Sequence, residues 1–244
     1  MASRALGRTG LTVSRIGLGT VKVGRNTGVK YPQPYELPSD GEVEELFAAA
    51  AEMGVNLVDT APAYGESEKR IAPYVRGMVI VTKAGEQYDG RSRFDFSPDA
   101  VRASAEASLA RLGRIDVLLL HSDGNDLKNL ASALPALREL KSEGKVRAIG
   151  ISAKTQEGIL EAVNGLDIVM APYNINDKSR GAALQIAHDA GLGVIVVKAM
   201  ESGHTINPEE ALHFVLKKSF VDAIVIGTLS LEHLEAAVRA AEPA

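Results

Sequence analysis

Short apolar runs recur along the chain, and each is followed by a stretch with helical spacing. The runs are apolar at consecutive positions rather than alternating ones, which is typical of a parallel sheet covered on both faces. Between them, apolar residues such as Val43, Leu46 and Ala50 return every three or four positions, which predicts amphipathic helices. The predicted strands are residues 15–20, 56–60, 78–83, 116–121, 147–152, 167–174, 193–198 and 222–228.

Capping and stop signals mark the helix boundaries. Ser39 and Glu42 have the spacing of a capping box. Ser97 and Asn207 each precede a proline at a predicted first helical turn. Glycines that suit a left-handed residue at a helix end lie just before five of the strands: Gly54, Gly113, Gly144, Gly165 and Gly191. Strands and helices are therefore expected to alternate.

Eight strand–helix units in about 240 residues match the usual size of a (β/α)8 or TIM barrel. A doubly wound open sheet shows the same alternation, so periodicity alone leaves both architectures open. Residues 1–244 are expected to form a single domain, because no Pro- or Ser-rich linker divides them and residues 21–40 fit a loop over one barrel mouth. Turn signals at Gly7 and Gly10 predict an N-terminal β-hairpin that closes the bottom of the barrel.

Composition excludes several classes of protein. The chain has 27 Lys and Arg against 31 Asp and Glu, a net charge of -4, which argues against nucleic acid or a membrane surface as a partner. The absence of cysteine excludes disulfides and thiolate chemistry. No signal peptide or membrane-length apolar run is evident, so we expect a cytoplasmic protein. The four histidines other than His121 are scattered, which predicts no metal site.

Candidate chemistry lies at the ends of the strands, because barrel enzymes build their active sites at the C-terminal face. The residues that end the eight apolar runs are Thr20, Asp59, Lys83, His121, Ser152, Asn174, Lys198 and Thr228. Each has an ordinary structural explanation, such as a solvated strand end for Lys83 or a packed ring for nearby Tyr64. A carboxylate, two ammonium groups and an imidazole on one rim are nevertheless an unusual set, and they favour a catalytic site.

The segments "NLVDTAPAYGESE", "VIVTKAG", "DVLLLHSDG" and "IGIS" follow in that order on successive strand ends. Together they resemble the aldo-keto reductase family. The likeness extends from "LGRTGLTVSRIGLGT" to "IVIGTLSLEHLEAAV", nearly the whole chain. The spacing of Asp59 and Tyr64, followed by Lys83 and then His121, is specific as a set. The resemblance implies an NAD(P)H-dependent barrel enzyme that reduces aldehyde or ketone carbonyls to alcohols.

By this resemblance Asp59, Tyr64, Lys83 and His121 are the catalytic residues. Hydride transfer to a carbonyl creates negative charge on oxygen, and Tyr64 would supply the proton that neutralises it. The Lys83 ammonium would lower the pKa of the phenol, while Asp59 would keep Lys83 charged and in place. His121 would donate a hydrogen bond to the carbonyl oxygen.

The resemblance also implies a nicotinamide cofactor, since no side chain of the protein can donate a hydride. No G-x-G-x-x-G segment supports a separate Rossmann site, so the barrel itself must hold the dinucleotide. Ser152 and Asn174 would contact the carboxamide of the nicotinamide, and a stretch that opens the last helix suits phosphate. The cofactor-binding residues implied by position are Thr20, Val21, Asp59, Ser152, Asn174, Lys198, Gly203, Gly227, Thr228 and His233.

Several positions depart from the family pattern. Ala153 and Ala171 stand where relatives commonly place amide side chains against the nicotinamide. Gly227 and His233 replace the Lys and Arg that typically hold a 2′-phosphate, and Ala237 replaces a common Asn. NADP(H) is favoured over NAD(H) by the resemblance alone.

Two other functions are compatible with the same residues. Lys83 and Lys198 both end barrel strands, so a Schiff-base aldolase is conceivable. The altered cofactor contacts leave room for a nucleotide-binding regulatory or scaffold barrel with little turnover. In the leading reading the partner is a small-molecule carbonyl substrate, and the protein is a monomer or a weak homo-oligomer.

Overall fold

Eight parallel strands close into a barrel in the computed structural model, which describes residues 2–242. Their order around the barrel is β3, β4, β5, β8, β9, β10, β11 and β12, and β12 pairs with β3 to complete the ring. This arrangement confirms the predicted (β/α)8 barrel and rejects the open sheet. The strands are β3 (Ile16–Gly19), β4 (Leu57–Asp59), β5 (Val79–Ala84), β8 (Ile115–His121), β9 (Val146–Ser152), β10 (Ile168–Pro172), β11 (Gly193–Val197) and β12 (Ala223–Ile226).

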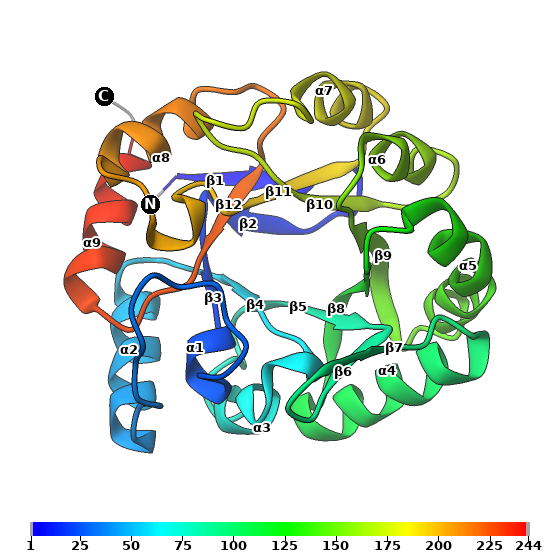
Figure 1. Ribbon diagram of the computed structural model, residues 1–244, viewed down its shortest axis with the longest axis horizontal. Helices are drawn as coiled ribbons and strands as arrows, with labels where there is room; N and C mark the ends of the chain where they lie inside the picture. The colour runs from blue at the N-terminus through cyan, green and yellow to red at the C-terminus, as the bar shows by residue number, and fades with distance from the viewer. Residues whose placement is uncertain (1, 243–244) are drawn as a thin grey trace.

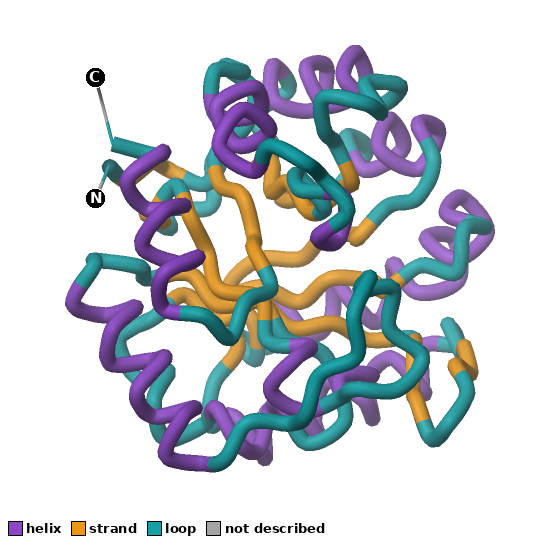
Figure 2. Tube along the Cα trace, turned by 60° about the vertical axis from the view of Figure 1, so that its left-hand side comes forward, coloured by secondary structure: helices purple, strands orange, loops and turns teal. Residues whose placement is uncertain are grey.

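Helices surround the strands on all sides, as Figures 1 and 2 show. The Ser39–Glu42 capping box is present, and the side chains of Ser97 and Asn207 accept hydrogen bonds from backbone N–H groups at their helix starts. The larger helices are α2 (Asp40–Glu52), α4 (Pro98–Leu112), α5 (Asp126–Ser142), α6 (Gln156–Ala162), α7 (Gly181–Asp189), α8 (Pro208–Leu216) and α9 (Leu231–Ala240). Among residues 2–242 there is no helix with both the length and the apolar character that a membrane crossing requires.

The apolar residues divide into two layers. The larger cluster lies between the strands and the helices, and a smaller cluster fills the barrel interior. Leu6, Leu11 and Val13 join that interior cluster from the N-terminal hairpin, whose strands are β1 (Ser3–Ala5) and β2 (Thr12–Ser14). The predicted hairpin at the bottom of the barrel is therefore confirmed. It closes that end, so the polar strand ends meet at the opposite mouth.

Gly7 lets the hairpin pass close to the barrel. Its φ is +51°, and a Cβ atom there would lie 2.2 Å from the backbone nitrogen of Gly193. We expect Gly7→Ala to lower the free energy of unfolding by about 1–3 kcal/mol, because it adds both backbone strain and a clash. Urea denaturation measures the loss. Gly10→Ala is the matched control, since Gly10 also has a positive φ but open space around it, and an equal loss in both variants would contradict the role given to the clash.

Two features were not predicted from the sequence. The connection at residues 21–40 was expected to be a loop, but it begins with a short helix, α1 (Val21–Gly24). A second hairpin, β6 (Glu86–Tyr88) with β7 (Ser92–Phe94), follows β5 at the barrel mouth. Arg25 joins the two features, because its guanidinium stacks on the ring of Tyr88, with 3.3 Å between the guanidinium carbon and the ring centroid. The remaining short elements are α3 (Ser67–Ile71), η1 (Pro62–Tyr64) and η2 (Glu201–Gly203).

Candidate active site

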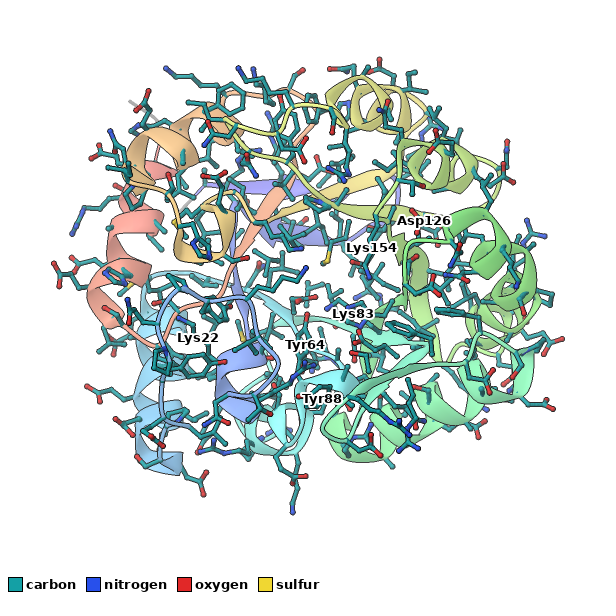
Figure 3. The ribbon with its side chains drawn as sticks, in the orientation of Figure 1. Lys22, Tyr64, Lys83, Tyr88, Asp126 and Lys154 are labelled. Carbon is teal, nitrogen blue, oxygen red and sulfur yellow. The ribbon has the colours of Figure 1, made fainter. Side chains whose placement is uncertain are left out.

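Four neighbouring segments bring the predicted catalytic residues together at one mouth of the barrel. Asp59 ends β4, Lys83 lies one residue before the end of β5, and His121 ends β8. Tyr64 is the last residue of η1, a single turn that begins at Pro62 and directs the chain back over the strands. Figure 3 shows Tyr64 and Lys83 side by side within the ring of elements. All four residues line the same cavity.

The Lys83 ammonium is the centre of this group. Its Nζ donates hydrogen bonds to Asp59 Oδ1 at 2.5 Å, to the carbonyl oxygen of Thr60 at 2.9 Å and to Tyr64 Oη at 3.2 Å. Lys83 is 1% exposed and Asp59 is 3% exposed, so the pair is shielded from water. Three acceptors around a buried ammonium fix its position and use all of its protons. A lysine held in this way is not a free amine, which argues against the Schiff-base alternative at Lys83.

The environment of Tyr64 differs from the expectation in one respect. The pKa of its hydroxyl is raised well above its ordinary value, first by burial and then by the negative charges of Asp59 and Glu86. Lys83 does contact the phenol, but its charge is balanced by Asp59, so burial dominates. The prediction that Lys83 lowers the pKa of the free Tyr64 was therefore wrong. A raised pKa keeps the hydroxyl protonated, which is the state that a proton donor needs.

His121 lies beside Tyr64, with the two rings edge to face and their centroids 6.1 Å apart. Its Nδ1 is 2.9 Å from Glu86 Oε2, on the hairpin that the sequence analysis did not identify. Burial lowers the pKa of His121, and the contact with Glu86 acts in the opposite direction. The site therefore contains two groups that can carry a proton towards a carbonyl oxygen, Tyr64 and His121.

A cavity of about 820 Å³ extends from these residues across the barrel mouth towards α9. That volume is within the range of ligand sites that enclose molecules the size of a drug or cofactor. The walls include most of the residues implied for cofactor binding: Thr20, Val21, Asp59, Ser152, Lys198, Gly203, Gly227, Thr228 and His233. At its far end α9 begins at Leu231, where free backbone N–H groups suit a phosphate. The shape and the lining fit a dinucleotide.

Asn174 is the one implied cofactor residue outside the lining of this cavity. Its side-chain oxygen accepts hydrogen bonds from the backbone N–H groups of Asn176 and Asp177, and its amide nitrogen donates to the carbonyl oxygen of Lys198. Ala171 also points away from the barrel interior, since it belongs to the layer between strands and helices. Ile168 and Met170 are the residues of this strand in the barrel-interior cluster, and Met170 lines the cavity.

Backbone strain gathers beside the same cavity. Among the described residues, the non-glycine positions with positive φ are Lys198, shortly before η2, and Glu201 and Ser202, within it. Such conformations cost roughly 1–3 kcal/mol each and concentrate at ligand sites. The segment from β11 to η2 is therefore shaped for a purpose other than stability, and the sequence offers no signal for it because none of the three residues is a glycine.

Tyr31 crosses the cavity from the β3–α2 connection. Its hydroxyl lies over Gly227, 2.5 Å from the place where a Cβ atom would be, so a larger residue there would displace the Tyr31 side chain. Burial raises the pKa of this tyrosine, and its ring carries Lys22 Nζ at 4.1 Å from the centroid. On the other side, His204 Nε2 lies 3.2 Å from the carbonyl oxygen of Lys30. The two loops thus meet above the cavity.

This protein combines a closed parallel barrel with an Asp–Tyr–Lys–His group in a cavity that is large enough for a dinucleotide. These features place it in the class of oxidoreductases that have a barrel fold. The family model for the "Aldo/keto reductase family" matches residues 15–210. The chain is 32% identical over 223 residues to an NADH-specific methylglyoxal reductase of Escherichia coli, which covers 81% of this chain and 67% of that protein. It is 30% identical over 236 residues to L-galactose dehydrogenase of Arabidopsis thaliana, with 84% and 70% covered.

Solved structures agree with the sequence relatives. A Pseudomonas aeruginosa structure described as an aldo-keto reductase superposes with a TM-score of 0.89 at 44% identity, over 98% of this chain and 93% of that one. An aldo-keto reductase of Bacillus halodurans has the same fold, with a TM-score of 0.86 at 23% identity and 100% and 92% covered. The chain belongs to the aldo-keto reductase family. It is an oxidoreductase that reduces carbonyl groups with a nicotinamide cofactor.

Proposed function

We propose that Tyr64 is the proton donor of this carbonyl reduction and that Asp59, Lys83 and His121 support it. The observation that carries the proposal is the single cluster in which the Lys83 ammonium contacts both the Asp59 carboxylate and the Tyr64 hydroxyl. A catalytic acid must be positioned within hydrogen-bond reach of the atom that it protonates, and Tyr64 faces the shared cavity. The cluster therefore supports the catalytic roles expected from the sequence.

The bound nicotinamide supplies the hydride that reduces the carbonyl carbon. Tyr64 gives its hydroxyl proton to the carbonyl oxygen, so the product is an alcohol and the phenolate remains on the enzyme. Lys83, 3.2 Å away, stabilises that phenolate as it forms. The phenolate then takes up a proton from solvent, which restores the hydroxyl group for the next turnover. His121 orients the carbonyl oxygen by hydrogen bonding.

Transfer of deuterium tests the proposed reaction directly. The enzyme is incubated with nicotinamide cofactor that carries deuterium at the transferred position, together with methylglyoxal and a panel of larger aldehydes and ketones. Deuterium on the carbonyl carbon of the alcohol product is the expected result. Tight nucleotide binding without turnover across the panel would instead support the regulatory alternative.

We also propose that NADP(H) is preferred over NAD(H). His233 and Arg239 line the end of the cavity formed by α9, where the Arg239 guanidinium offers a charged donor for a 2′-phosphate. Glu209 lines the same end with a negative charge, and an E. coli relative is described as NADH-specific, so the preference needs a direct comparison.

Arg239→Ala is expected to raise the KM for NADPH about tenfold and to leave the KM for NADH nearly unchanged, since a charge-assisted hydrogen bond contributes roughly 1.5–3 kcal/mol. Steady-state kinetics with NADPH and with NADH measures the two KM values in the wild type and the variant. Glu235→Gln is the matched control, because Glu235 pairs with Arg239 at 2.8 Å and its replacement keeps the cation. Equal changes for the two nucleotides, or a wild-type preference for NADH, would reject NADP(H) as the preferred cofactor.

Three further properties remain proposals. We propose that residues 1–244 act as one domain, that the protein is a monomer or a weak homo-oligomer, and that it works in the cytoplasm on small carbonyl compounds. The absence of cysteine and the modest net charge of -4 support this setting. Light scattering coupled to size-exclusion chromatography tests the oligomeric state.

A further inference from the structure

A partly buried carboxylate lies next to the catalytic group, and the reaction described above does not use it. Glu86 is the first residue of β6, and its side chain is 11% exposed. One oxygen, Oε2, is 2.9 Å from His121 Nδ1, while the other, Oε1, accepts a hydrogen bond from Ser92 Oγ at 2.6 Å. Even partial burial of a charge is costly unless it is paired, so the position of Glu86 against His121 calls for a functional explanation.

The β6–β7 hairpin is anchored so that Glu86 stays in place. Ser92, which holds Oε1, lies directly across the hairpin on β7 and pairs with Tyr88 of β6. The Tyr88 ring in turn stacks under the Arg25 guanidinium. Arg25 donates hydrogen bonds to the carbonyl oxygens of Ala63, Thr27 and Gly28, which connects the hairpin to the turn that carries Tyr64. The carboxylate is thus fixed relative to both proton-carrying residues.

The contact decides which ring nitrogen of His121 carries a proton. Nδ1 is fully buried and faces the carboxylate, and a lone pair there would be repelled by the negative oxygen. The oxygen lies off the line of the ring N–H bond, so the attraction acts mainly through charge. Glu86 is ionised, because Ser92, Lys154 and the contact with His121 outweigh its burial and lower its pKa to about 2. The proton is therefore on Nδ1.

A proton on Nδ1 has a consequence for the other nitrogen. In a neutral imidazole only one nitrogen carries a proton, so Nε2 would present a lone pair to the cavity and would repel a carbonyl oxygen. Nε2 can donate to that oxygen only when the ring holds a second proton and is an imidazolium. The charged groups that face the ring are Glu86 from β6, Lys83 from β5 and Asp59 from β4, with the neutral Tyr64 hydroxyl from η1. Of the two carboxylates, Asp59 is already neutralised by Lys83.

We propose that Glu86 is a positioning residue that holds a proton on His121 Nδ1 and stabilises the imidazolium that donates a hydrogen bond to the carbonyl oxygen. This inference rests on the role proposed for His121 in carbonyl reduction. It assigns a charge-based function to the β6–β7 hairpin, whose residues are not part of the lining of the large cavity.

Nuclear magnetic resonance of the protein labelled with ¹⁵N-histidine tests the proposal without any need for turnover. The signal of His121 is identified by its loss in His121→Asn. We expect Glu86→Gln to move the titration midpoint of His121 to lower pH, because the neutral amide no longer favours the imidazolium. Glu86→Asp keeps the charge and should retain more of the wild-type midpoint. Asp89→Asn is the matched control, since Asp89 lies on the same hairpin and pairs with Arg93 instead.

Kinetics distinguish a charge effect from a loss of structure. For carbonyl reduction, Glu86→Gln should lower kcat/KM about tenfold near neutral pH, as expected for a shift of one pH unit in the midpoint, with the KM for nucleotide unchanged. The deficit should shrink as the pH is lowered, because acid restores the imidazolium in the variant. A deficit that is constant with pH, or a His121 midpoint unchanged in both Glu86 variants, would overturn the proposal. If the wild type does not reduce carbonyl compounds but the His121 midpoint still moves to lower pH in Glu86→Gln, only the proposed function is refuted.

Discussion

Replacement of Tyr64 by phenylalanine is expected to reduce the turnover of carbonyl substrates by about two to four powers of ten, the usual contribution of a positioned acid. The change removes one hydroxyl group from a ring that is otherwise kept, so the shape of the cavity is preserved. It also removes one acceptor of the Lys83 ammonium, but the contacts to Asp59 and the Thr60 carbonyl remain. The loss should therefore fall on kcat and not on binding.

Nucleotide binding provides the control for this variant. The protein has no tryptophan, so binding is best followed through the emission of added NADPH. Tyr88→Phe is a matched substitution, because Tyr88 lies nearby but its hydroxyl contacts only Thr27 Oγ1, at 3.3 Å, among the described residues. Full activity in Tyr64→Phe, or an equal loss in Tyr88→Phe, would remove Tyr64 from the role of proton donor.

The barrel could be predicted from the sequence because its signals are local. Consecutive apolar runs, capping residues such as Ser39 and glycines such as Gly54 each act within a few positions, and all indicated the same alternation. The Asp59–Tyr64–Lys83–His121 group could also be anticipated, because barrel topology places strand ends on one rim whatever the side chains do. The order of the strands around the barrel is also simple, because each strand pairs with the barrel strand that comes next in the sequence.

The parts that escaped prediction depend on contacts between distant segments. Glu86 follows Lys83 by only three residues, yet its contact with His121 depends on the β6–β7 hairpin, a short element of six paired residues. No local pattern in the sequence predicted that hairpin. The pKa of Tyr64 is raised by burial and by the charges of Asp59 and Glu86, and it is lowered by Arg25, a combination that no spacing rule contains. Asn174 illustrates the converse: it was predicted to end a strand, but it lies beyond the end of β10 at Pro172, and its side chain accepts hydrogen bonds from the loop N–H groups of Asn176 and Asp177.

The same buried charges connect catalysis to stability. Lys83 and Asp59 were retained in the interior although charged pairs gain little over apolar residues of similar size. The role proposed for Lys83 beside Tyr64 gives the pair a function that an apolar replacement could not supply. If the pair serves function, replacing both charged residues together should leave the protein folded, whereas replacing one of them leaves a buried charge without its partner.

Lys83→Met is expected to lower the free energy of unfolding by about 3–5 kcal/mol, because Asp59 is then a buried and unpaired carboxylate. Asp59→Asn should cost a similar amount by leaving the Lys83 ammonium without its counter-charge. The double variant Asp59→Asn with Lys83→Met removes both charges, so its loss should be well below the sum of the two single losses. Urea denaturation of the four proteins measures this coupling.

Carbonyl reduction should be lost in Lys83→Met and in the double variant, since neither of them retains the cation that stabilises the Tyr64 phenolate. The double variant is the decisive case, because it combines recovered stability with absent turnover. A double variant as unstable as the sum of the singles would show that the pair is required for folding itself. Recovered turnover would show that Tyr64 needs no neighbouring cation, and the catalytic role given to Lys83 would then be wrong.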